Sequence, residues 1–125
     1  MAEKRIKITA GSVSAEAVLN DSATAEKIWN ALPIEAAGDT WGDEIYFSIP
    51  VRDALAADAK DVVQLGELGY WPPGSAFCIF FGRTPVSRGD EIRPASAVNL
   101  IGKVTGDRKI FKKVRSGENL KTGML

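Results

Sequence analysis

The sequence contains no histidine and only one cysteine, Cys78, among its 125 residues. Histidine is the usual general base near neutral pH and the commonest metal ligand, so its absence excludes Ser-His-Asp and Cys-His catalytic sites. A single cysteine excludes an intrachain disulfide, which is typical of proteins from a reducing compartment. We therefore expect a cytoplasmic protein without histidine-dependent chemistry.

Motifs for phosphate, dinucleotide and calcium binding are also missing. No Gly-x-Gly-x-x-Gly run occurs. Gly102-Lys103 does not complete a P-loop, because Ala97 holds the first glycine position and Val104 follows the lysine. No EF-hand spacing is present, which leaves only an irregular carboxylate site for a metal. The sequence predicts no cofactor and no metal site.

The charges balance, but they are unevenly distributed. The chain has 16 basic and 16 acidic residues, and residues 103–125 hold seven of the basic but only two of the acidic ones. Such a segment can attract nucleic acid or form the solvated face of a helix; we favour the solvated face and expect no nucleic-acid partner. No secretory signal and no apolar run of membrane-spanning length are apparent, so we expect no membrane association.

Period-two patterns predict a mostly β protein. Residues 4–8 and 13–19 alternate polar and apolar side chains around Gly11-Ser12, as in a hairpin. Asp21 or Ser22 can cap a short amphipathic helix that Pro33 ends. Further strands are predicted over residues 43–49, 68–71, 76–81 and 97–104.

Three segments are interpreted differently. Residues 51–63 fit either one helical face or a loop, and residues 82–94 are predicted to be a long polar loop. Residues 107–115 are predicted to form a terminal helix, and the last ten residues a frayed polar tail. About six to eight short strands with one or two helices favour a closed barrel or sandwich over a parallel α/β sheet.

Several long segments resemble a family of small prokaryotic proteins with a cyclophilin-like fold and no assigned function. The resemblance covers about residues 6–104 and is carried by Trp41–Phe47, Tyr70–Gly74, Phe77–Pro85 and Gly89–Ser96. It implies a closed eight-stranded barrel with one or two short covering helices. We therefore expect one domain over residues 1–115 and a polar C-terminal tail over residues 116–125.

The similarity to true cyclophilin prolyl isomerases is weaker. Those enzymes carry a Phe-His-Arg stretch with the catalytic arginine and a Gln-Gly-Gly-Asp stretch beside the site. The sequence has no histidine, and Ser87-Arg88-Gly89-Asp90 lacks the glutamine and one glycine of the second stretch. No catalytic residue can be transferred by position.

Candidate binding residues follow from the alternation of strand 43–49. If Ile45, Phe47 and Ile49 fill the barrel, then Glu44 and Tyr46 point away from it and can line a groove or an ordinary solvated face. Nearby aromatic and charged side chains complete the predicted groove, in which the candidate ligand-binding residues are Trp41, Glu44, Tyr46, Trp71, Phe80 and Arg93.

Each of the other candidates also has a structural interpretation. Trp71 belongs to a Trp-Pro-Pro-Gly turn that can bind peptides or cap the barrel. Cys78 and the neighbouring phenylalanines lie in an apolar run and suit core packing, although Phe80 falls on the face opposite Phe77. Arg93 can bind a carboxylate or phosphate, or form an ion pair with Asp90 or Glu91.

The leading hypothesis is a non-enzymatic binding module that holds a small molecule or a short, proline-containing peptide outside the barrel. One alternative is an atypical peptidyl-prolyl isomerase, in which Arg93 contacts the prolyl nitrogen and Phe80 lines the proline pocket. Another is a structural subunit that pairs through exposed tryptophan and proline surface. The sequence identifies neither the ligand nor the oligomeric state.

Overall fold

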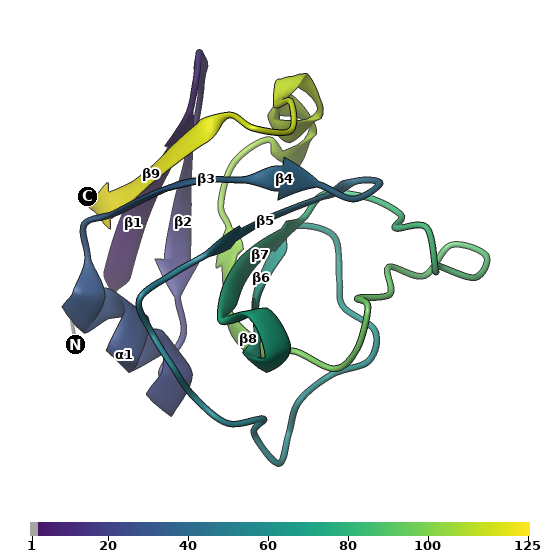
Figure 1. Ribbon diagram of the computed structural model, residues 1–125, viewed down its shortest axis with the longest axis horizontal. Coiled ribbons are helices and arrows are strands. Elements are labelled where there is room, and N and C mark those ends of the chain that lie inside the picture. Colours follow the sequence, from purple (N-terminus) through teal and green to yellow (C-terminus); the bar gives the residue numbers. More distant parts are fainter. Residues whose placement is uncertain (1–2) are drawn as a thin grey trace.

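The chain forms a single antiparallel sheet that curls into a nearly closed barrel (Figure 1). The computed structural model describes residues 3–125. The sheet order is β3-β9-β1-β2-β8-β6-β7-β5-β4. The elements along the chain are β1 (Lys4–Ala10), β2 (Val13–Leu19), α1 (Ala23–Ala31), β3 (Ile34–Ala37), β4 (Asp39–Thr40), β5 (Glu44–Ser48), β6 (Glu67–Trp71), η1 (Pro72–Gly74), β7 (Ala76–Phe80), β8 (Asn99–Val104), η2 (Arg108–Lys113) and β9 (Asn119–Met124).

The barrel is closed by one continuous segment of chain. Strands β3 and β4 are the two edges of the sheet, and only Gly38 separates them in sequence. A Cβ at Gly38 would lie 2.3 Å from a methyl group of Leu120, so a larger residue at this crossing would have to displace the buried Leu120 side chain. The prediction of eight strands differs from the nine observed because this bend divides the closing segment in two.

The predicted N-terminal hairpin and helix are confirmed. Strands β1 and β2 pair from Lys4↔Leu19 to Ala10↔Val13 around a turn in which Gly11 has φ +60°. The Ser22 hydroxyl oxygen accepts a hydrogen bond from the Ala25 N–H at 3.2 Å and caps α1. The helix then inserts its buried Ile28 side chain into the main core.

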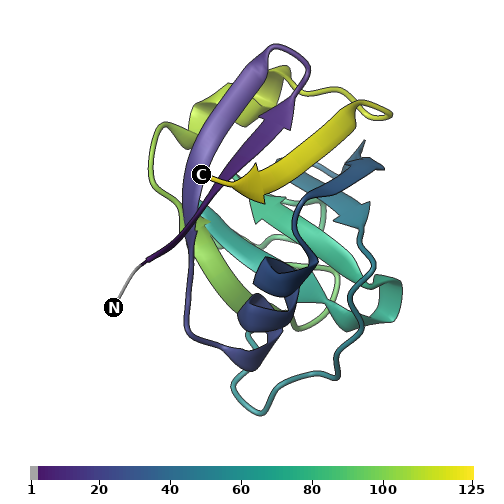
Figure 2. The same cartoon turned by 90° about the vertical axis from the view of Figure 1, so that its left-hand side faces the viewer.

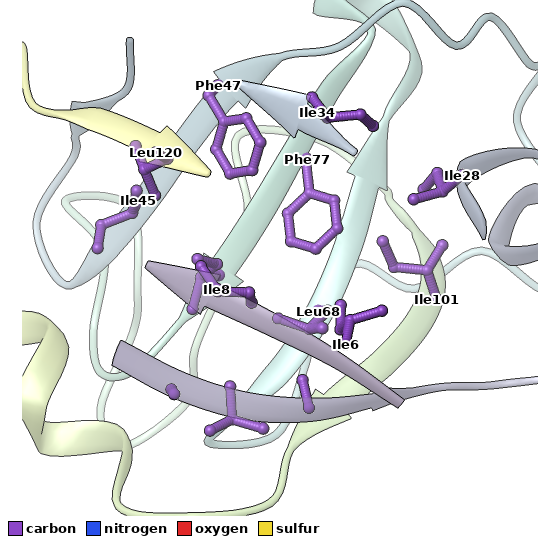
Figure 3. Packing of buried hydrophobic residues seen from close by; sticks show 14 of the residues in the cluster. Ile6, Ile8, Ile28, Ile34, Ile45, Phe47, Leu68, Phe77, Ile101 and Leu120 are labelled. Carbon is purple, nitrogen blue, oxygen red and sulfur yellow. The ribbon is translucent and has the colours of Figure 1, made fainter. Parts of the chain in front are cut away.

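Inward-facing side chains of the strands fill the barrel interior. Figure 3 shows Ile6 and Ile8 from β1 facing Phe77 and Leu68 across the interior. The Phe47 and Phe77 rings stack with their centroids 5.0 Å apart. The predicted inward face of strand 43–49 is confirmed, because Ile45, Phe47 and Ile49 all belong to this core. Because side chains fill the interior, a binding site is to be sought on the outer wall of the barrel.

Two long loops, residues 49–66 between β5 and β6 and residues 81–98 between β7 and β8, cover part of that outer wall. Residues 51–63 form no helix; they run as a loop with isolated bridges at Lys60↔Val98 and Val63↔Ile92. These bridges hold the loop against the segment before β8. Together the loops bury a second, smaller hydrophobic cluster that contains Val63, Ala76, Cys78, Phe80, Ile92 and Val98. Strand β7 is therefore buried on both faces, as its continuous apolar run predicts.

One prediction for the C-terminal region is wrong, and another is confirmed only in part. Residues 116–125 are not a frayed tail, because β9 pairs with β1 and β3 and completes the barrel (yellow in Figure 2). Leu120 is fully buried. Thr122 is also buried, and because this inward residue is polar, the segment lacks the alternating apolar pattern that predicts a strand. The helix expected over residues 107–115 is a shorter 3-10 helix, η2, which is capped by the Asp107 side chain.

Within the described residues, no helix combines the length and the apolar character needed to cross a bilayer.

Leu120→Ala tests the role of β9 in the barrel. The substitution leaves a cavity beside Gly38, so we expect a loss of about 2–4 kcal/mol in the free energy of unfolding. Lys121→Ala is the matched control, because the adjacent side chain is exposed and its loss should change stability by no more than about 0.5 kcal/mol. Urea denaturation of both variants measures the difference; equal midpoints would contradict a structural role for β9.

Candidate functional site

A small pocket opens on the outer wall of the barrel, over β5 and β7. Its volume is about 140 Å³, and we call it the aromatic pocket. Its lining consists of Trp41, Glu44, Tyr46, Trp71, Cys78 and Ala95. The pocket therefore combines three large aromatic side chains with one carboxyl group and one thiol.

The pairing of β5 with β7 places the floor of the pocket. Tyr46 lies directly opposite Cys78, and Glu44 lies opposite Phe80, on the face that points away from the barrel. Trp41 is brought back over this face by a tight turn, in which its N–H donates to the Glu44 carbonyl oxygen at 2.8 Å. The turn requires Gly42, whose φ is +62°.

The opposite wall comes from Trp71 and the loop before β8. Trp71 ends β6, and its indole Nε1–H donates a 2.7 Å hydrogen bond to the Ser96 hydroxyl. This bond fixes the ring beside Ala95, which also lines the pocket. The indole N–H is thus already used, and the apolar part of Trp71 remains available to a ligand.

Glu44 is the chemically unusual residue of the pocket. Its side chain belongs to a residue that is only 5% exposed, and Oε1 has no hydrogen-bond partner within the described structure. Burial raises the pKa of Glu44 to about 7, and a hydrogen bond with the Cys78 side chain opposes part of this increase. The carboxyl group therefore changes its charge near neutral pH.

Cys78 is a neutral neighbour rather than a nucleophile. Its side chain is buried, and burial together with the negative charge of Glu44 raises the thiol pKa well above the usual value. The thiolate form is thereby disfavoured. This placement agrees with the packing role expected from the sequence, although Cys78 also reaches the pocket wall.

Four of the six predicted binding residues meet in this pocket, and two do not. Trp41, Glu44, Tyr46 and Trp71 line it together. Phe80 is fully buried in the second hydrophobic cluster, because the loops that cover β7 seal this side chain from solvent. Arg93 also lies outside the lining, since its Nε donates to Glu91 at 2.6 Å and the ion pair orders the loop.

Sequence reasoning missed two lining residues. Cys78 has the same outward parity as Phe80, so alternation alone could have placed it on this face. Ala95 carried no comparable signal, because its position depends on how the long loop folds back toward Trp71.

Larger hollows elsewhere on the surface offer less specific chemistry. One of about 370 Å³ lies over β1, β3 and β9, and another of about 460 Å³ lies between β2 and η2. Both are lined by charged side chains that include Lys7. The first also contains the buried Thr122 hydroxyl without a partner, but this group is neutral and costs less to leave unpaired than a carboxylate. The aromatic pocket is therefore the stronger candidate.

The protein is a small antiparallel barrel of the cyclophilin-like class, with a filled interior and a pocket on its outer wall. The family model described as Cyclophilin-like matches residues 4–122, so the chain belongs to this family, as the sequence resemblance indicated. A solution structure of the hypothetical protein AF2241 from Archaeoglobus fulgidus is 41% identical, with a TM-score of 0.85, and the match covers 98% of this chain and 95% of that one.

A more distant structural match is McbB in complex with tryptophan. It is 10% identical with a TM-score of 0.63, and the match covers 95% of this chain but 44% of McbB. At this identity the match shows a shared fold. A comparison with curated proteins found no match.

Glu44→Gln tests the burial of the carboxyl group. The unfolded chain has a glutamate pKa of 4.5, whereas the folded value is about 7, so the native state binds the extra proton between these values. The free energy of unfolding of the wild type should therefore fall as the pH rises through this interval. Glutamine does not titrate. The free energy of unfolding of the Glu44→Gln variant, relative to that of the wild type, should therefore increase by about 2–3 kcal/mol between pH 5 and pH 8. Urea unfolding of both proteins at the two pH values measures this change, and parallel pH profiles would show that Glu44 ionises normally.

Proposed function

We propose that this protein is a non-enzymatic binding module that holds part of a small ligand in the aromatic pocket. The observation that carries the proposal is the buried Glu44 carboxyl group, whose Oε1 lacks a partner inside a pocket with three aromatic walls. An unpaired polar atom of this kind costs free energy in the empty protein. A ligand that donates a hydrogen bond or brings a positive charge would recover part of that cost.

The aromatic walls supply the affinity that a single polar contact lacks. Trp41, Tyr46 and Trp71 are each partly exposed, so a ligand can cover apolar surface on all three. Tyrosine and tryptophan provide large contact area with few rotatable bonds, which limits the entropy lost on binding. Apolar walls with one buried polar group are the usual composition of a small-molecule site.

The size of the pocket limits what can enter. Its volume of about 140 Å³ is below the roughly 300–1,000 Å³ typical of pockets that enclose a whole drug-sized ligand. The pocket therefore suits a head group or a single peptide side chain, with the rest of the ligand outside. McbB, which shares the fold, is in complex with tryptophan, a molecule of the small-ligand class proposed here.

The isomerase alternative has less support. It assigned the prolyl pocket to Phe80 and the catalytic hydrogen bond to Arg93. Phe80 is sealed beneath the loops, and Arg93 is paired with Glu91 outside the aromatic pocket. These positions supply neither the apolar surface nor the free guanidinium that the alternative needs.

Tryptophan fluorescence and thermal shift together test the binding module. The chain has three tryptophans, of which Trp41 and Trp71 line the pocket, whereas Trp29 on α1 packs against the main core. A small-molecule and peptide library should yield hits that raise the melting temperature and change the fluorescence. Trp71→Ala and Tyr46→Ala should weaken those hits by about tenfold or more, because each removes one wall.

Trp29→Phe is the control for that experiment. It removes a fluorophore outside the pocket and should leave both the affinity and the ligand-dependent fluorescence change intact. Hits that are insensitive to Tyr46→Ala and Trp71→Ala would place binding elsewhere and contradict the proposal.

A further inference from the structure

We infer that the aromatic pocket selects an organic cation, an alkylammonium group, and that it does so through Glu44. The inference rests on the proposed function and adds the chemical class of the ligand. Its basis is the juxtaposition of one buried carboxyl group with the side chains of Trp41, Tyr46 and Trp71.

Charge complementarity supports a cation over an anion. Within residues 3–125, no lysine or arginine lines the pocket, and the basic residue that the sequence suggested, Arg93, is paired with Glu91 outside it. A negatively charged ligand would meet Glu44 without any compensating base. A cation would instead pair with the carboxylate in a buried setting, where screening by solvent is weak.

The walls favour an alkylated cation over an inorganic one. Indole and phenol rings attract a positive charge over their faces, and this attraction strengthens where water is excluded. Methyl groups on the nitrogen would also cover the apolar ring surface. The polar groups of the pocket are too few to replace the hydration shell of a small metal ion, which needs six or more oxygen ligands.

The ionisation of Glu44 makes this recognition dependent on pH. The groups that face it are the Tyr46 phenol from β5, the Cys78 thiol from β7, the rings of Trp41 and Trp71, and Ala95 from the loop. Burial disfavours the charged form of the Cys78 thiol, whereas Glu44 gains its negative charge near neutral pH. Cation affinity should therefore rise with pH through neutrality, and binding below that point should release a proton.

Choline and 3,3-dimethylbutan-1-ol provide a matched pair of probes, because they have the same shape and differ in the charge on one atom. Titration followed by protein NMR at pH 8 should show choline binding at least about tenfold more tightly than the neutral probe. Between pH 8 and pH 6 the choline affinity should fall by about tenfold, in proportion to the ionised fraction of Glu44, while the neutral probe should bind equally at both values.

Glu44→Gln should remove the preference for choline and its pH dependence. The matched control is Asp43→Asn, which deletes a neighbouring carboxylate that points toward Lys112 rather than into the pocket. This control should retain most of the preference, which separates direct pairing from the general field of the surface.

The outcomes distinguish the inference from the proposed function. Equal affinities for the two probes, or a choline preference that survives in Glu44→Gln, would overturn cation selection. If library hits still depended on Tyr46 and Trp71 in that case, the binding module would stand with a neutral ligand. If no probe or library compound responded to these residues, both proposals would fall.

Discussion

The pairing of β5 with β7 is the interaction on which the core and the pocket both depend. Because side chains alternate along a strand, one register sends Phe47 and Phe77 into the barrel and leaves Tyr46 and Cys78 outside. A slip of one residue would reverse every side chain and place Glu44 in the barrel interior. The stacked Phe47 and Phe77 rings oppose such a slip. Packing inside the barrel thus determines the chemistry on its outer wall.

The long loops make the outer wall an environment of low polarity. They carry little regular structure, and side-chain hydrogen bonds add to the backbone bridges that hold residues 51–63 in place. The Tyr70 hydroxyl donates to the Val51 carbonyl oxygen at 2.7 Å, and Asn99 accepts from the Ala56 N–H at the same distance. Both of these side chains belong to neighbouring strands of the barrel, Tyr70 to β6 and Asn99 to β8. The barrel therefore positions the loops, and the loops bury the residues around Glu44.

The sequence predicted those features that follow from local periodicity. Alternation identified the hairpin, the inward face of β5 and the outward position of Glu44 and Tyr46. It could not identify β9, because Thr122 occupies an inward position and breaks the apolar pattern. It also could not predict what covers an outward face. Phe80 has the same parity as Cys78, yet the loops bury one completely and leave the other at the pocket wall.

Periodicity also could not predict that Arg93 lies outside the pocket, because a local ion pair holds its side chain elsewhere. Glu91 is two residues away and reaches the guanidinium without help from the rest of the fold. Glu44 has no such neighbour: burial disfavours its charged form, and no base lies in the pocket to compensate. An isosteric amide would fill the same space without that electrostatic penalty. A carboxyl group at this position therefore opposes folding at neutral pH, and an occupant that pairs with it would turn this destabilising feature into binding energy.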